Sequence, residues 1–168
     1  MKKTCILLIG MPGSGKSEAG RKVSEITGLS FVDMDEYIEE TENRTIPEIF
    51  KEGETAFRDI ETACAKKLSK LENTVISAGG GTVTRDENLK YLRKNSFVIF
   101  IDRPVEAIVS QKNVKDHRPL LKEGEEKLYA LYDERISLYR KYADFTVDNS
   151  SSMEDCIKKI VEIIREVF

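Results

Sequence analysis

Short apolar or β-branched runs alternate along this chain with longer amphipathic segments. The runs predicted as strands are 4–9, 29–33, 73–78, 96–102 and 144–148. The segments predicted as helices lie near 16–27, 35–70, 86–94, 104–112, 125–142 and 152–167. Pro47 is expected in the first turn of a new helix, which divides the long segment 35–70 in two. Strands separated by helices predict a three-layer α/β/α fold, in which helices cover both faces of a central five-stranded parallel sheet.

Length and charge narrow the class of protein. A chain of 168 residues predicts a single domain over 1–168. With 27 basic and 30 acidic residues the net charge is −3, so no overall field favours nucleic acid or an anionic membrane. The apolar run near the N-terminus is short and continues into glycines without a cleavage site, and no run approaches the ~20 apolar residues of a membrane span. We expect a cytoplasmic monomer.

Cysteine and histidine usage argues against several kinds of site. Cys5, Cys64 and Cys156 are far apart and lack metal-type spacing, which is typical of small buried residues in a reducing compartment. His117 is the only histidine, which argues against a histidine-based triad or a histidine-rich metal site.

The segment Gly10 to Ser17, GMPGSGKS, matches the phosphate-loop pattern G-x-x-x-x-G-K-[ST] between a predicted strand and a predicted helix. Its glycines allow the backbone N–H groups to surround a phosphate beside the N-terminus of the helix. Lys16 is suited to bind the β- and γ-phosphates, and the Ser17 hydroxyl is suited to bind Mg²⁺. A glycine-rich turn without a ligand is the alternative. The residues predicted to bind ATP here are Pro12, Gly13, Ser14, Gly15, Lys16 and Ser17.

Two carboxylates, Asp33 and Asp35, follow the second predicted strand. In an extended chain, residues two apart point the same way, so both could face one cleft. One could hold Mg²⁺ through water while the other accepts a proton from a substrate hydroxyl. The alternative is that either residue caps the next helix, a role that fits Asp35 well.

Three consecutive glycines, Gly79 to Gly81, follow the third predicted strand. They let a ligand approach the main chain, where N–H groups can bind a carboxylate; a flexible loop is the alternative. This strand lacks the terminal aspartate that often holds Mg²⁺ in phosphate-loop proteins. We therefore predict Ser17 and Asp33 as the metal partners, with one Mg²⁺ for each ATP.

Four further segments complete a specific set: GETAFRDIE (53–61), AGGGTVT (78–84), HRPLL (117–121) and ERISLYRKYAD (134–144). Their order and spacing resemble the shikimate kinase family over nearly the whole chain. The resemblance implies a nucleoside-monophosphate-kinase-like fold with a mobile lid near 113–124 and a substrate-binding region near 33–61. It also implies ATP-dependent phosphorylation of the shikimate 3-hydroxyl, a step of aromatic amino-acid (chorismate) biosynthesis.

The same resemblance implies roles for single residues. Asp35 is similar to the residue that holds the substrate hydroxyls and acts as base, and Asp33 to a water-mediated Mg²⁺ partner. Arg118 is similar to the lid arginine that reaches over the phosphates, and completes the expected catalytic set with Asp35 and Lys16. The expected substrate contacts are Asp35, Arg58, Gly79, Gly80, Gly81 and Arg135. Glu61, three residues after Arg58, can hold its guanidinium. Taken singly, Arg58 and Arg135 would be ordinary surface arginines.

One position departs from the family pattern, and two other functions stay open. Family members commonly carry an arginine beside adenine at the position that Gln111 occupies here. Glutamine at this position is expected to weaken nucleotide binding, although its side chain can still hydrogen-bond the base.

A related small-molecule kinase of the gluconate type is the first alternative function. The second is a nucleotide-binding regulatory module without activity, which the presence of Asp35, Lys16 and Arg118 argues against.

Overall fold

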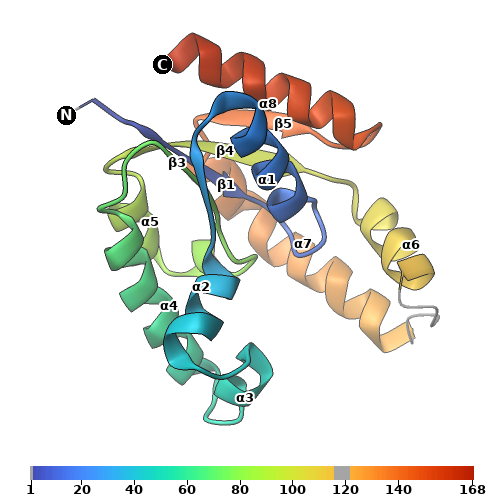
Figure 1. Cartoon of the computed structure of the whole chain (residues 1–168). Helices are drawn as coiled ribbons and strands as arrows, with labels where there is room; N and C mark the ends of the chain where they lie inside the picture. The colour runs from blue at the N-terminus through green and yellow to red at the C-terminus, as the bar shows by residue number, and fades with distance from the viewer. Residues whose placement is uncertain (1, 116–121) are drawn as a thin grey trace.

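The computed structural model describes residues 2–115 and 122–168, with a sheet of parallel strands at its centre (Figure 1). The strand order is β2-β3-β1-β4-β5, and each neighbouring pair is parallel. The strands are β1 (Cys5–Ile9), β2 (Ser30–Asp33), β3 (Thr74–Ser77), β4 (Ser96–Asp102) and β5 (Phe145–Asp148). The predicted five-stranded parallel sheet is therefore confirmed, and the strand ends differ from the predicted ones by at most one residue.

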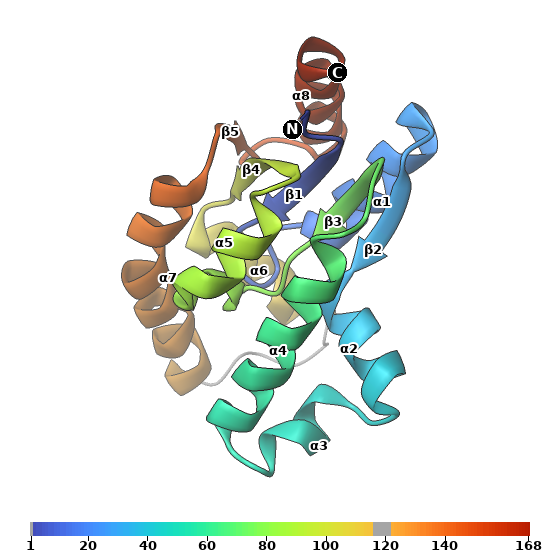
Figure 2. The ribbon, with the colours of Figure 1, turned by 90° about the vertical axis from the view of Figure 1, so that its left-hand side faces the viewer.

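Helices cover both faces of the sheet, as Figures 1 and 2 show from two directions. One layer holds α1 (Lys16–Thr27) and α8 (Met153–Val167), while α4 (Glu54–Leu68), α5 (Asp86–Leu92) and α7 (Lys122–Tyr142) lie on the opposite side. The remaining helices are α2 (Met34–Glu42), α3 (Ile46–Phe50), the 3₁₀ turn η1 (Thr82–Thr84) and α6 (Val105–Lys115). The three-layer α/β/α prediction is confirmed.

The central strand β1 explains why both layers form. All five of its residues are buried, and successive side chains of a strand point to opposite faces. Ile6 and Leu8 pack in the cluster that includes residues of α1 and α8. Leu7 and Ile9 pack in the larger cluster on the other face. A strand that is apolar on both sides requires cover on both sides, which the two helix layers supply.

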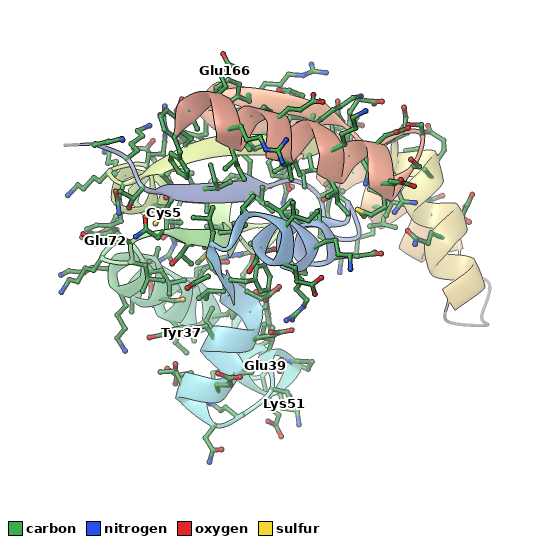
Figure 3. All side chains as sticks on the ribbon, turned by 45° about the horizontal axis from the view of Figure 1, so that its top comes forward. Cys5, Tyr37, Glu39, Lys51, Glu72 and Glu166 are labelled. Carbon is green, nitrogen blue, oxygen red and sulfur yellow. The ribbon has the colours of Figure 1, made fainter. Side chains whose placement is uncertain are left out.

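The segment predicted as one helical stretch divided at Pro47 contains three helices instead of two. The break between α2 and α3 follows from Asn43, which adopts a left-handed conformation (φ 54°), and from a capping box at Thr45 with Pro47 in the first turn. The Glu39 carboxylate, on α2 in Figure 3, accepts a hydrogen bond from the Ile46 N–H over 2.9 Å. The unpredicted second break lies before α4, where Gly53 has a φ of +104° that a helix cannot include.

Fewer residues separate α6 from α7 than the predicted lid, 113–124, contains. Helix α6 continues to Lys115 and α7 begins at Lys122, so the two helices extend beyond the predicted limits of 112 and 125. The intervening residues 116–121, which include His117 and Arg118, lie outside the described residues. The expectation of a mobile lid stays a prediction.

The three cysteines are buried, as composition led us to expect. Cys5, Cys64 and Cys156 are buried free thiols. Burial raises the pKa of Cys64 to about 12 and that of Cys156 to about 11, so neither is a reactive thiolate at neutral pH. Within residues 2–115 and 122–168, no helix is both long and apolar enough to cross a membrane.

The register of the sheet brings the predicted motifs to one edge. Ser77, the last residue of β3, lies opposite Leu8 of β1 on one side and Asp33 of β2 on the other. The phosphate loop follows β1, the two aspartates follow or end β2, and the three glycines follow β3. All of these segments therefore leave the sheet at its carboxyl edge, where ligands bind in open α/β sheets.

Candidate active site

The phosphate loop occupies the turn between β1 and α1. Gly13 and Gly15 have φ angles of +79° and +97°, which residues with a Cβ rarely adopt, so the shape of this loop depends on glycine at both positions. The Ser14 N–H donates to the Met11 carbonyl over 3.1 Å, which closes the turn. Helix α1 begins directly after Gly15, so its N-terminal N–H groups are directed at the same space.

Lys16 lies inside this loop and is 7% exposed. Its ammonium donates to the carbonyl oxygens of Gly10 (2.9 Å) and Met11 (2.8 Å). Burial lowers the pKa of Lys16 to about 8, although the negative charges of Asp35 and Asp33 oppose that shift. The cation is thus held by neutral carbonyl groups, and an anion bound in the loop would supply the compensating charge.

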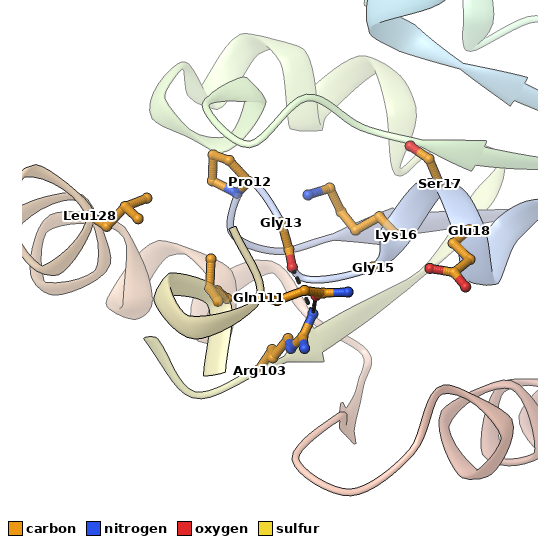
Figure 4. A pocket seen from close by; sticks show the side chains of 10 residues that line it. Pro12, Gly13, Gly15, Lys16, Ser17, Glu18, Arg103, Gln111 and Leu128 are labelled. Carbon is orange, nitrogen blue, oxygen red and sulfur yellow. Dashed lines mark hydrogen bonds between the residues drawn. The ribbon is translucent and has the colours of Figure 1, made fainter. Parts of the chain in front are cut away.

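A cavity of about 380 Å³ adjoins the loop (Figure 4). Gln111, which the sequence predicts to bind ATP, lines this cavity, and its side-chain oxygen accepts a hydrogen bond from Arg103. Arg103 also donates to the Gly13 carbonyl over 3.2 Å. Sequence reasoning missed Arg103, although its position directly after a strand at the carboxyl edge was an available signal. The lining residues are Pro12, Gly13, Gly15, Lys16, Ser17, Glu18, Arg103, Ile108, Gln111 and Leu128.

Three side-chain oxygens meet beside the start of α1. The Ser17 hydroxyl donates to one Asp33 oxygen and lies 3.2 Å from the Ser77 hydroxyl. The other Asp33 oxygen accepts from the Glu36 N–H over 3.0 Å and so caps α2. Of the two aspartates that could cap this helix, Asp33 is therefore the one that does so, although Asp35 fitted that role in the sequence. Sequence reasoning also missed Ser77, which ends the strand before the three glycines.

This oxygen set fits Mg²⁺, which prefers hard oxygen ligands and binds through one or two protein groups together with phosphates and water. Within the part of the chain that the structure describes, no group of three or more His, Cys, Asp or Glu side chains could hold a metal alone. Ser17 and Asp33 could contribute two ligands to such a site, with phosphate oxygens and water as the others.

Asp35 lies in the first turn of α2, so it does not continue the extended chain of Asp33, as the sequence pattern had predicted wrongly. The helical turn nevertheless directs it toward the glycine run: a Cβ added at Gly79 would lie 3.0 Å from an Asp35 oxygen and 3.0 Å from a Glu61 oxygen. Burial raises the pKa of Asp35 to about 6, and the negative charges of Asp33 and Glu61 add to that effect.

A second cleft, of about 550 Å³, contains every residue predicted to contact the substrate. It extends from α2, α3 and α4 across the glycine run to α7. Pro12 lines both this cleft and the cavity beside the phosphate loop, so the two are adjacent. The lining residues are Pro12, Asp35, Ile46, Phe50, Glu54, Phe57, Arg58, Glu61, Gly79, Gly80, Gly81, Thr84, Lys127, Leu131, Glu134 and Arg135.

Arg58 is fixed within this cleft. It donates to one Glu61 oxygen over 2.8 Å, and Thr82 donates to the other over 2.9 Å. Glu61 is 1% exposed, so the ion pair and hydrogen bond offset the cost of burying its charge. The guanidinium lies directly against Gly81, where any Cβ would overlap it. Glu61 thus holds Arg58 as predicted, while Thr82 was missed.

Arg135, on α7, approaches the cleft from the other side. It is 8% exposed, and its Nε has no hydrogen-bond partner among the residues that the structure describes. One turn later the Tyr139 hydroxyl donates to the Gly80 carbonyl over 2.6 Å. A buried arginine with an unused donor is suited to an anionic ligand, because the ligand would provide the missing acceptor.

The combined arrangement suits phosphoryl transfer. Lys16 and the loop can hold a nucleoside triphosphate in one cavity, and Asp35 lies in the adjoining cleft, where a hydroxyl acceptor would be bound. Arg58 and Arg135 give the acceptor cleft two cations for a carboxylate. Arg118, predicted as the third catalytic residue, lies outside the described residues.

Comparisons with known proteins agree with this geometry. The shikimate kinase family model matches residues 12–165 of the chain. A shikimate kinase from Clostridium beijerinckii is 46% identical over 162 residues, which cover 96% of this chain and 95% of that protein. The solved structure of shikimate kinase from Acinetobacter baumannii in complex with shikimate has a TM-score of 0.88 at 33% identity, and the match covers 98% of this chain and 94% of that one. A gluconokinase structure from Sinorhizobium meliloti shares the fold, with a TM-score of 0.63 at 12% identity over 99% and 98% of the two chains.

The raised pKa of Asp35 predicts a stability gain on removing its charge. Because the pKa moves from 3.8 to about 6 on folding, the folded state binds a proton more tightly, and Asp35 lowers stability as pH rises through that window. Asp35→Asn should raise the free energy of unfolding by about 1–3 kcal/mol at pH 8 in the absence of ligands. Urea unfolding at pH 8 and pH 4 measures this.

At pH 4 the gain should largely vanish, since Asp35 is then protonated in the folded state. Asp133→Asn, at an exposed position on α7, is the matched control and should change little at either pH. An Asp35→Asn variant equally or less stable than wild type at pH 8 would contradict the proposed desolvation.

Proposed function

This chain belongs to the shikimate kinase family and phosphorylates shikimate with ATP, and we propose that its two adjoining clefts divide that reaction between them. The cavity beside the phosphate loop binds ATP, and the cleft between α4 and α7 binds shikimate with its 3-hydroxyl toward the γ-phosphoryl group. One observation carries this assignment: Asp35, Arg58, Gly80 and Arg135 line a single cleft that meets the phosphate-loop cavity at Pro12.

ATP is held by the loop backbone and by Lys16. Anionic phosphates replace the carbonyl oxygens of Gly10 and Met11 as partners of the Lys16 ammonium, which also raises its pKa above the value in the empty loop. Ser17 and Asp33 hold one Mg²⁺ with the nucleotide. When bound, that ion neutralises phosphate charge and polarises the transferred group.

Asp35 accepts the proton of the shikimate hydroxyl. A pKa near 6 leaves its carboxylate ionised at pH 7 yet more basic than an ordinary aspartate, which is the compromise that a general base requires. Burial is the main cause of this raised pKa, and the negative charges of Asp33 and Glu61 add to it. Asp35 thus both orients the hydroxyl and removes its proton as the phosphoryl group arrives.

The shikimate carboxylate binds between Arg58 and Arg135 beside the main chain of Gly79, Gly80 and Gly81. A guanidinium can form two parallel hydrogen bonds with a carboxylate, which fixes the substrate in orientation as well as position. Arg58 pairs with Glu61 over 2.8 Å and with the exposed Glu54 over 3.5 Å, and the N–H groups that these two carboxylates leave unused are available to the ligand. From sequence alone, we propose Arg118 as the cation that meets the charge of the transferred group.

The alternative functions have less support. The gluconokinase structure is similar in fold alone, at 12% identity, so it carries no substrate assignment. A module without activity would not need the loop lysine and a carboxylate of raised pKa at adjoining clefts. The combination of Lys16 and Asp35 favours a working kinase.

The activity and the role of Asp35 can be tested together. A coupled assay of ADP release should show turnover with shikimate and far less with gluconate. Asp35→Asn should lower kcat by ~10²–10⁴-fold, the usual worth of a positioned base, while ATP affinity changes little. Equal rates with both acceptors would reject the substrate assignment, and a variant with kcat within about threefold of wild type would reject the base.

Arg58→Lys tests the carboxylate site. Lysine keeps the charge but loses the planar fork, so KM for shikimate should rise about tenfold or more, while KM for ATP stays within about twofold. Arg44→Lys is the matched control, because Arg44 pairs with Glu52 over 2.7 Å at an exposed site. If both constants rose together, Arg58 would serve the structure of the cleft and not its ligand.

A further inference from the structure

Arg103 occupies an unusual place in the nucleotide cavity. It follows the last residue of β4 directly, and its guanidinium bridges two elements: one nitrogen donates both to the Gly13 carbonyl (3.2 Å) and to the Gln111 side-chain oxygen (Figure 4). Gln111 belongs to α6, two turns beyond the start of that helix. The side chain of Arg103 is therefore tied to the phosphate loop on one side and to α6 on the other.

Among the described residues, no negative charge of the protein compensates the charge of this guanidinium. Both of its acceptors are neutral, and no carboxylate lies within ion-pair distance of Arg103 among the described residues. Glu18 lines the same cavity without pairing with it. An unpaired and half-buried guanidinium in a ligand cavity has its charge available for a ligand.

The contacts of Arg103 place it away from the phosphates. In a phosphate loop the N–H groups point inward to the anion, so a carbonyl such as that of Gly13 faces the outer wall. The phosphate end of the cavity is defined by Lys16 and Ser17. Arg103 lies beside Gln111, on the other side of the loop backbone from the Lys16 side chain in Figure 4, and the cavity lining also includes the apolar side chains of Ile108 and Leu128, which suit a ring better than a triphosphate.

We propose that Arg103 binds the nucleoside portion of ATP and that Gln111 positions it for that contact. The inference rests on the nucleotide site proposed above and assigns a residue within it. A guanidinium donates its hydrogen bonds in its own plane, so bonds to Gly13 and Gln111 do not use its flat faces, and such a face can stack on an aromatic base. Gln111 thus acts through Arg103 instead of through the base directly.

The decisive experiment compares two ligands that share phosphates but not the nucleoside. Calorimetry should give Kd for ADP and for pyrophosphate, each with Mg²⁺, in wild type and in Arg103→Met. The variant should weaken ADP about 3–30-fold, since a stacked cation is worth that range, and should leave pyrophosphate within about twofold. KM for ATP should rise in parallel, while kcat at saturating ATP stays near the wild-type value.

The positioning role of Gln111 requires a double-mutant cycle. Gln111→Met should weaken ADP about 2–5-fold in the wild-type background and have no further effect beside Arg103→Met, because its acceptor then has no donor to hold. Arg165→Met, at an exposed position on α8, is the matched control and should change neither affinity. Equal melting temperatures would show that the variants are folded.

Each remaining outcome has a defined meaning. Equal weakening of pyrophosphate and ADP would overturn the proposal, because Arg103 would then support the phosphate loop. Unchanged ADP affinity in Arg103→Met would overturn it as well, and additive effects of the two substitutions would reject the role of Gln111. Wild-type protein that binds pyrophosphate but not ADP would refute the nucleotide site itself, a failure distinct from that of Arg103.

Discussion

Strand β3 lies between β2 and β1, and the register of this trio is the constraint on which the site depends. It sets Ser77 opposite both Leu8 and Asp33, so that the phosphate loop, the oxygens beside Ser17 and the glycine run leave the sheet at the same level. A shift of one residue would turn every side chain of β3 to the other face. Because β3 is buried on both faces, apolar packing strongly specifies the register that the chemistry requires.

That register also concentrates charge in a place where water is scarce. Lys16 is pushed toward neutrality, with a pKa of about 8, while Asp35 is pushed toward protonation, with a pKa of about 6. Glu61 is buried almost completely and is tolerable only with Arg58 and Thr82 as partners. Such an arrangement lowers the stability of the ligand-free protein, and substrate charges offset part of the cost when they bind. The same groups are useful in catalysis because they are poorly solvated.

Sequence patterns predicted the layers, the strands and several of the residues that line the two clefts, because each rests on local rules. Apolar runs define strands, and the carboxyl edge of a parallel sheet collects whatever follows them. Errors arose where local conformation was inferred from spacing: Asp35 is helical instead of extended, and a third helix begins after Gly53 in the stretch 35–70. These features depend on which of several competing hydrogen bonds forms, and a short polar segment offers more than one solution.

Contacts between side chains that are distant in sequence were beyond such rules, and Gln111 shows why. Compared with the family pattern at that position alone, Gln111 marks the loss of an arginine from the nucleotide site. In the folded chain its oxygen accepts from Arg103, which also contacts the phosphate loop, so the cavity still contains a guanidinium close to that position. A departure from a family pattern therefore cannot be interpreted without the residues that surround it in space. The cationic side chain that lines this cavity can belong to α6 or to the residue after β4. Nucleotide binding depends on where its charge lies and not on which segment carries it.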